Sequence, residues 1–296
     1  MTRSGLFIEK IKLKVTFRIQ YLYFASMHGY YTFAKFIEHR FRGRRWDSFH
    51  SPFLFRLMTY CCDDRIHSEA FKEIEGERKK MIRSKEKISR QDFGAGKEER
   101  YCKENQKISS IAKKSLSLPF QCRFLYRLME YINPVSMIEF GTCLGISSAY
   151  IAKGVSDGQL ISIEGDMSLY RIAHSLFEKL SIKNIKVINS SFENFLTEEE
   201  KNIGSLDFIF LDGNHRSEAL IEYYQHLKPH FTSETILMVD DIYWSSDMNA
   251  GWKLLTKMPE VRQSVDCFHF GLLFFREDFI NKQNHVVRLP VKAILR

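Results

Sequence analysis

Long uncharged apolar runs and paired cysteines are both scarce in this chain of 296 residues. No uncharged run approaches the ~18 residues that a membrane-spanning helix needs. The apolar patch nearest the start has neither the long apolar core nor the cleavage site of a secretory signal. The six cysteines include no C-x-x-C pair, so they indicate neither a zinc site nor a disulfide scaffold. We therefore expect a soluble protein of the reducing cytoplasm.

Acidic residues are scarce in the first 60 positions, where eleven Lys and Arg face three acids. This segment accounts for the whole net charge of +8, since the remaining residues balance. It could lie on an anionic membrane surface, contact nucleic acid or meet an acidic partner, or it could be an ordinary solvated helical face. Residues 11–19 alternate as a strand does but also fit a helical stripe, so the sequence leaves both open.

Residues 1–107 are expected to form a basic, mostly helical region. Ser51 is a candidate N-cap with Pro52 at the first helical position, which predicts a helix there. Residues 63–107 are dense in both charge signs, and residues 68–90 indicate an exposed helix or helix pair. The "DFGAG" stretch, 92–96, interrupts residues 63–107 and is interpreted as a loop that closes over a ligand. It is not a kinase motif, because the chain has no H-R-D loop or V-A-I-K strand.

A second region, 108–296, alternates strands with helices. After an amphipathic helix comes the apolar strand "SMIEF", and further apolar strand candidates follow with helical stretches between the first five. This order predicts a doubly wound, mainly parallel α/β sheet. The last two apolar stretches, "SVDCFHF" and "GLLFFRE", lack room for a helix between them and should form an antiparallel hairpin.

A glycine loop, "EFGTCLGISS", follows the first of these strands. It is not a P-loop, because the glycine spacing is one residue short and no Lys follows. It is not a dinucleotide loop either, because the middle glycine of G-x-G-x-x-G is replaced by Cys143. Gly141 and Gly145 therefore let the backbone approach a ligand that does not carry several phosphate charges.

This loop resembles the first motif of the class I S-adenosylmethionine-dependent methyltransferases, an acid followed by G-x-x-x-G. Glu139, Gly141 and Gly145 match it, and Thr142 and Ser147 fit the G-T-x-x-G-x-S variant common in small-molecule O-methyltransferases. The resemblance implies a Rossmann-like fold and places these five residues at the cofactor.

The same resemblance extends along the chain. Glu164, nineteen residues after Gly145, stands where the family places the carboxylate that binds the ribose hydroxyls. Ser191 and Phe192 would flank the adenine. Stretches such as "HSPFLF" and "FLDGNHR" are similar to those of uncharacterised bacterial members with a helical N-terminal extension.

Three aspartates end apolar strands, and such ends meet at the ligand-binding edge of an open sheet. The catechol-type and the sugar and macrolide O-methyltransferases hold magnesium with an Asp after the fourth strand and a pair after the fifth. The resemblance therefore implies that Asp212, Asp240 and Asp241 bind Mg²⁺, a hard ion that prefers oxygen. Asp212 is also expected beside the cofactor and in catalysis. Ordinary turn and cap duty is the alternative for all three.

His215, three residues after Asp212, is a candidate general base because its ordinary pKa lies near neutrality. A loop histidine held by hydrogen bonds is the alternative. The expected reaction is methyl transfer to a hydroxyl of a small-molecule acceptor. A methyltransferase for a macromolecule or lipid, recruited by the basic segment, and a non-catalytic cofactor-binding module remain alternatives. An oligomer is compatible with the sequence, but nothing indicates one.

Overall fold

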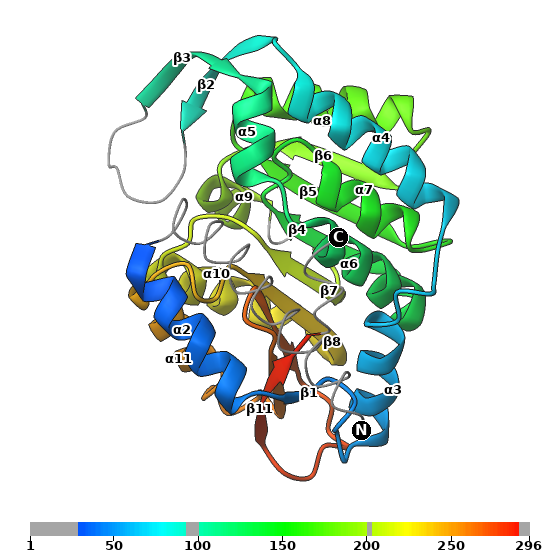
Figure 1. Ribbon diagram of the computed structural model, residues 1–296, viewed down its shortest axis with the longest axis vertical. Coiled ribbons are helices and arrows are strands. Elements are labelled where there is room, and N and C mark those ends of the chain that lie inside the picture. The colour runs from blue at the N-terminus through cyan, green and yellow to red at the C-terminus, as the bar shows by residue number, and fades with distance from the viewer. Residues whose placement is uncertain (1–28, 93–100, 200–202, 290–296) are drawn as a thin grey trace, which may run out of the picture.

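The computed structural model describes residues 29–92, 101–199 and 203–289 (Figure 1). The alternating segment 11–19 and most of the "DFGAG" stretch lie outside these ranges, so both predictions about them stay predictions. Within the described ranges no helix combines the length and apolar character needed to cross a membrane.

Nine strands form one sheet with helices on both faces (Figure 1). In their spatial order they are β1 (Arg44–Arg45), β11 (Gln283–Arg288), β9 (Gln263–Asp266), β10 (Phe270–Phe274), β8 (Phe231–Asp240), β7 (Leu206–Leu211), β4 (Ser136–Phe140), β5 (Gln159–Glu164) and β6 (Ile185–Asn189). The five strands from β8 to β6 pair in parallel. This is the Rossmann-like, doubly wound sheet that the sequence predicts.

Helices connect and cover these strands. They are α2 (Gly29–Arg42), α3 (Pro52–Cys61), α4 (Glu69–Arg83), α5 (Ile108–Ser115), α6 (Pro119–Ile132), α7 (Ile146–Lys153), α8 (Met167–Lys179), α9 (Phe192–Glu198), α10 (Ser217–Leu227), the short η2 (Lys228–His230) and α11 (Ser246–Leu255). In α3, Ser51 accepts a hydrogen bond from the Leu54 N–H and Pro52 is the first helical residue, which confirms the predicted start.

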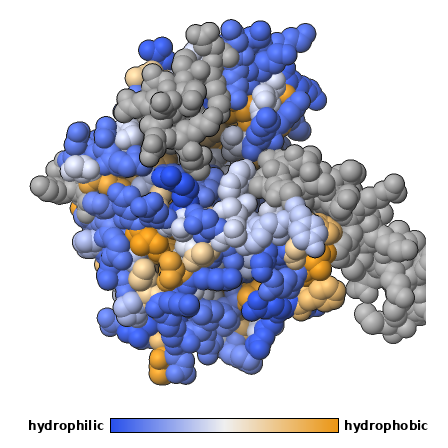
Figure 2. All heavy atoms as spheres, turned by 90° about the vertical axis from the view of Figure 1, so that its left-hand side faces the viewer, coloured by the Kyte–Doolittle hydropathy of each residue, from blue (hydrophilic) through white to orange (hydrophobic). Residues whose placement is uncertain are grey.

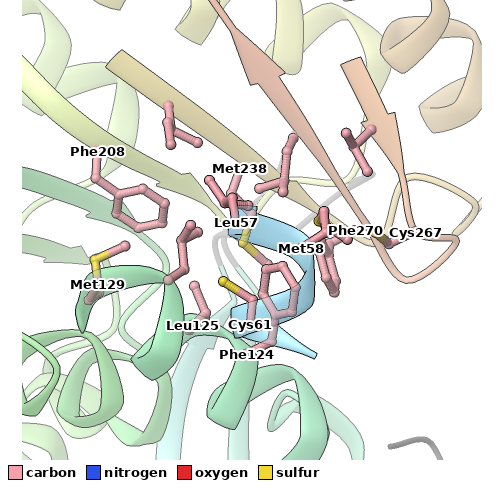
Figure 3. Close-up of a cluster of buried hydrophobic side chains, with 14 of the residues drawn as sticks. Leu57, Met58, Cys61, Phe124, Leu125, Met129, Phe208, Met238, Cys267 and Phe270 are labelled. Carbon is pink, nitrogen blue, oxygen red and sulfur yellow. The ribbon is translucent and has the colours of Figure 1, made fainter. Parts of the chain in front are cut away.

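The central strands read as continuous apolar runs because both of their faces are buried. In β7, Phe208 and Phe210 point to the cluster shown in Figure 3, which also contains Leu57 of α3 and Phe124 of α6. Ile209, the residue between them, belongs to the cluster on the opposite face. Alternate side chains of one strand thus join two separate apolar layers.

The C-terminal strands confirm one prediction and extend it. β9 and β10 pair antiparallel, as the short connection requires, and β10 also pairs antiparallel with β8. The sheet continues beyond this hairpin, because β11 runs parallel to β9 and β1 runs parallel to β11. The segment Arg44–Arg45, far away in sequence, therefore closes the edge of the sheet.

The prediction of an exposed helix or helix pair for residues 68–90 is partly wrong. Helix α4 is present, but Lys87–Asp92 (β2) and Tyr101–Lys107 (β3) pair as an antiparallel hairpin. The dense charge hid the strand pattern, because a hairpin that is mainly exposed needs few apolar residues. Helix α4 is also less exposed than expected, since Phe71 and Ile74 are buried against α7.

The molecular surface is mostly hydrophilic on the face drawn in Figure 2, where apolar side chains form several separate patches. Scattered apolar residues of this kind are normal for a globular protein. The region boundary at residue 107 stays a prediction, but side chains from both of its sides share one cluster, including Leu54, Met58 and Leu125.

Replacing Leu57 by Ala should lower the free energy of unfolding by about 2–5 kcal/mol, because the side chain is fully buried in the cluster of Figure 3. Urea denaturation measures this change. Phe55→Ala on the exposed side of α3 is the matched control, with an expected change within about 0.5 kcal/mol. A similar small change in both variants would show that α3 adds nothing to the core.

Candidate active site

The predicted site residues follow strands whose carboxyl ends meet at one edge of the sheet. In the register, Phe140 of β4 lies opposite both Ile163 of β5 and Leu211 of β7, and Leu211 lies opposite Val239 of β8. The residues that come next along each strand are therefore neighbours: the glycine loop, Glu164, Asp212 and the aspartate pair.

The glycine loop approaches its neighbours too closely for side chains. Gly141 has φ +110°, and a Cβ there would lie 2.0 Å from the backbone oxygen of Asp212. Gly145 has φ +81°, and its Cβ would meet the Phe177 ring at 2.9 Å. Both backbone conformations are ones that glycine adopts without strain. The two glycines are thus required by the shape of the loop itself.

Beneath this loop lies a buried carboxylate, Glu139. Its oxygens accept hydrogen bonds from the hydroxyls of Ser147 at 2.7 Å, Ser162 at 2.6 Å and Ser148. Burial raises the pKa of Glu139, and the three hydroxyls oppose that effect. Thr142 is buried too and hydrogen-bonds with Ser162 at 2.6 Å. Glu139, Thr142 and Ser147 are therefore brought together under the loop, and they tie its two ends to β5.

Glu164 closes the other side of the loop. Its Oε2 accepts a hydrogen bond from the Cys143 N–H at 2.8 Å, and its Oε1 accepts one from the Asp166 N–H at 2.9 Å. Burial raises the pKa of Glu164 to about 7, against the effect of these two bonds. Each oxygen retains a further lone pair, so the carboxylate can still accept hydrogen bonds from a ligand.

Ser191 and Phe192 lie where β6 leads into α9. The Ser191 hydroxyl caps α9 by accepting a hydrogen bond from the Asn194 N–H at 3.2 Å. The Phe192 ring packs edge-on to Phe140, with ring centroids 5.2 Å apart, and lies against Gly213. The structure therefore gives both residues a local packing role at the sheet edge.

Asp212 and Asp240 are neighbouring carboxyl groups, of which Asp240 is buried and Asp212 is partly buried. Burial raises the pKa of both well above the ordinary range. Repulsion from other carboxylates adds to this effect, from Asp241 and Glu139 on Asp212 and from Asp212 and Asp241 on Asp240. Ser117 donates to Asp212 at 3.5 Å, and the Gln121 amide donates to Asp240. Neither Ser117 nor Gln121 could be identified from the sequence, since neither belongs to a recognisable motif.

Asp241 and His215 form a second, more open pair. His215 Nε2 lies 4.0 Å from Asp241 Oδ2, and the Asp241 side chain is 40% exposed. The His215 ring packs on Trp244, with centroids 5.4 Å apart. His215 Nδ1 is buried without a hydrogen-bond partner in the described part of the chain. The imidazole is thus fixed in place by Trp244 and Asp241 at the edge of the site.

The magnesium site predicted for the three aspartates stays a prediction. Asp212 and Asp240 accept hydrogen bonds from Ser117 and Gln121, and Asp241, with φ +52°, lies beside His215. Among residues 29–92, 101–199 and 203–289, no group of three His, Cys, Asp or Glu side chains is arranged to hold a metal ion. The amide N–H of Gln121, directed at Asp240, is a donor and cannot bind a cation.

The loop after β8 is held from behind by helix α2. Tyr243 donates to Asp266 Oδ2 at 2.8 Å, and His39 Nε2 lies 3.1 Å from Asp266 Oδ1. Tyr243 also stacks on Phe268, with centroids 4.9 Å apart. This buried cluster could not be read from the sequence, because its members come from three distant segments.

Known proteins support this description of the fold. Residues 138–242 match the model of a family described as a methyltransferase domain. The SAH-bound methyltransferase PaMTH1 of Podospora anserina is 14% identical, with 77% of this chain and 97% of that one covered at a TM-score of 0.53. The O-methyltransferase of Bacillus cereus in complex with SAH is 16% identical, with 73% and 96% covered at a TM-score of 0.52. No curated protein matches the chain.

Residues 138–242 thus match a methyltransferase domain, and the sheet around them has the fold of these two solved methyltransferases. The glycine loop that first indicated this class lies within the matched residues.

Replacing Gly141 by Ala should destabilise the protein by about 2–4 kcal/mol, because the new Cβ would collide with the Asp212 backbone at a positive φ. Thermal and urea denaturation measure the loss. Gly76→Ala in α4 is the control: no atom lies within 4 Å of its Cβ, so it should stabilise by about 0.5–1 kcal/mol. Equal stability of the Gly141 variant and the wild type would disprove the close approach.

Proposed function

We propose that the protein transfers a methyl group from S-adenosylmethionine to a hydroxyl of a small molecule. The observation that carries this proposal is the arrangement along one sheet edge. The buried carboxylate of Glu164, which accepts hydrogen bonds, lies on one side of the glycine loop. The His215–Asp241 pair lies beyond the other side.

The residues around the glycine loop fit the cofactor. Glu164 would accept hydrogen bonds from both ribose hydroxyls through its remaining lone pairs. Gly141 and Gly145 keep side chains away from the path of the bound molecule, and Ser191 and Phe192 would flank the adenine. Glu139 has a different role in this proposal, since its oxygens are already occupied by three serine hydroxyls. It would shape the loop from below together with Thr142 and Ser147.

The chemistry requires alignment and removal of one proton. S-adenosylmethionine supplies a methyl group on a sulfonium: the acceptor oxygen bonds to this carbon as the S–C bond breaks, and its electron pair stays on sulfur. His215 would take the acceptor's hydroxyl proton on Nε2, and Asp241 would stabilise the resulting imidazolium. Asp212, which lies next to Asp240, would orient the acceptor and the cofactor.

The proposal routes no step through magnesium, because the aspartates are not arranged as a set of ligands. A requirement for Mg²⁺ stays a prediction from the resemblance. The choice of a hydroxyl acceptor rests on His215 as the proposed base, because the fold alone does not select the acceptor.

An anionic partner at the basic N-terminal region also stays a prediction. Among the described residues, Lys35 and Arg42 both pair with Glu38, and Arg45 pairs with Asp47. These three cations face two carboxylates, so this part of the positive charge is only partly neutralised, and recruitment to an anionic surface would draw mainly on other basic residues of the segment.

Glu164→Gln should weaken S-adenosylhomocysteine binding roughly 10–100-fold, because the variant loses a charged acceptor for the ribose hydroxyls. Isothermal titration with and without magnesium measures this change and shows whether the metal contributes. Glu178→Gln is the matched control, since that side chain is 71% exposed on α8. No binding to folded wild-type protein under either condition would refute the proposed function.

His215→Asn should lower the turnover number by about 10²–10⁴ while S-adenosylhomocysteine binding is retained, because only the proton acceptor is lost. The assay follows formation of S-adenosylhomocysteine across a panel of phenols, catechols and aliphatic alcohols. His174→Asn, on the exposed part of α8, is the control. Unchanged turnover in the His215 variant would exclude His215 as the base.

A further inference from the structure

The β2–β3 hairpin, from the N-terminal region, packs against the cofactor side of the sheet edge. Figure 1 shows the hairpin beside α5 and α8. The Ser168 hydroxyl of α8 donates to the backbone oxygen of Ser89 in β2 at 2.7 Å. Ile88, next to it, packs on the apolar cluster that contains Leu144 of the glycine loop and Leu169 of α8. The hairpin therefore packs against the same apolar cluster as the glycine loop, which is the loop proposed to bind the cofactor.

Arg90 is a charged residue of β2 that lies where the hairpin packs against α8. Its side chain is 19% exposed, and its Nε lies 3.6 Å from Asp166 Oδ2. One terminal nitrogen donates to Gln106 of β3 at 3.4 Å. Its Nε–H is buried without a hydrogen-bond partner in the described part of the chain. A buried donor that lacks a partner is costly, so its retention here requires a reason.

Asp166 links Arg90 to the carboxylate that would bind the ribose. Its Oδ1 caps α8 by accepting hydrogen bonds from the N–H groups of Ser168 at 2.7 Å and Leu169 at 3.0 Å. Its Oδ2 faces Arg90, and its own N–H donates to Glu164 Oε1 at 2.9 Å. The position of the Asp166 turn therefore decides where the Glu164 carboxylate points.

We propose that Arg90 is a positioning residue of the cofactor site, which holds the Asp166 turn so that Glu164 meets the ribose hydroxyls. The inference rests on the proposed function and deepens it. It makes the β2–β3 hairpin part of the cofactor site rather than an appendage, because the hairpin supplies both the apolar contact of Ile88 and the charge of Arg90.

The charge of Arg90 has a second effect on Glu164. Burial and Asp166 raise the pKa of Glu164, whereas Arg90 and the N–H groups of Cys143 and Asp166 lower it, with the result at about 7. Cofactor binding should therefore weaken as the pH falls through about 7, because protonation removes acceptor capacity. Without Arg90 the pKa of Glu164 would rise further, and this weakening would begin at a higher pH.

The test measures S-adenosylhomocysteine affinity between about pH 5.5 and pH 8.5 for Arg90→Met, Arg90→Lys and the wild type. Arg90→Met should bind about tenfold more weakly near neutral pH, with its pH midpoint moved upward. Arg90→Lys should restore much of the midpoint, since it keeps the charge. Lys87→Met, an exposed cation on the same strand, is the control and should match the wild type. Thermal melts confirm that each variant is folded.

Three outcomes would overturn the inference. Wild-type affinity in Arg90→Met would do so, as would a loss of affinity with an unchanged pH midpoint, because mere packing of the hairpin would produce that result. Failure of Arg90→Lys to restore the midpoint would exclude the charge. In all three cases the wild type still binds, which leaves the proposed function intact, whereas absence of wild-type binding would remove both.

Discussion

The close approach of the glycine loop to the end of β7 is the constraint on which the site depends. Gly141 donates its N–H to Ile163 of β5 at 3.0 Å, and its Cα lies against the backbone oxygen of Asp212. Three parallel strands thus meet at one residue that must lack a side chain. This contact fixes the separation between Glu164 on one side of the loop and the carboxyl pair on the other. The distance between Glu164 and the two aspartates therefore depends on this contact as well as on the strands that carry them.

Four carboxyl groups lie around this contact, and all but Asp212 are buried. Glu139 accepts from three hydroxyls, Asp212 and Asp240 accept from Ser117 and Gln121, and Glu164 accepts from two backbone N–H groups. Burying a charge without hydrogen-bond partners costs free energy. A buried carboxylate with few partners therefore marks a position where a ligand can supply the missing hydrogen bonds. By this criterion Glu164 is the carboxylate that can accept further hydrogen bonds from a ligand, although Glu139 lies in the more recognisable motif.

The sequence predicted the parts of the site that follow from strand ends. The register of parallel strands makes the residues after β4, β5 and β7 neighbours, so the glycine loop, Glu164 and Asp212 could be placed together from the chain alone. It could not supply the contacts made across elements, such as Ser162 on Glu139 or Gln121 on Asp240. It also missed the β2–β3 hairpin, because mainly exposed strands lack the apolar alternation that predicts them. The aspartates show the limit most clearly, since their strand ends were predictable but the hydrogen-bond partners of their carboxyl groups were not.

The N-terminal region reaches both sides of the sheet edge by separate elements. The hairpin contacts the glycine loop and α8 on the cofactor side. Helix α2 holds the loop after β8 through Asp266, to which Tyr243 donates and beside which His39 lies. That loop carries Asp241 and Trp244, the two side chains that fix His215. The sheet thus provides the strand ends that line the candidate site, whereas the geometry of the charged groups on those ends also depends on elements from the N-terminal region.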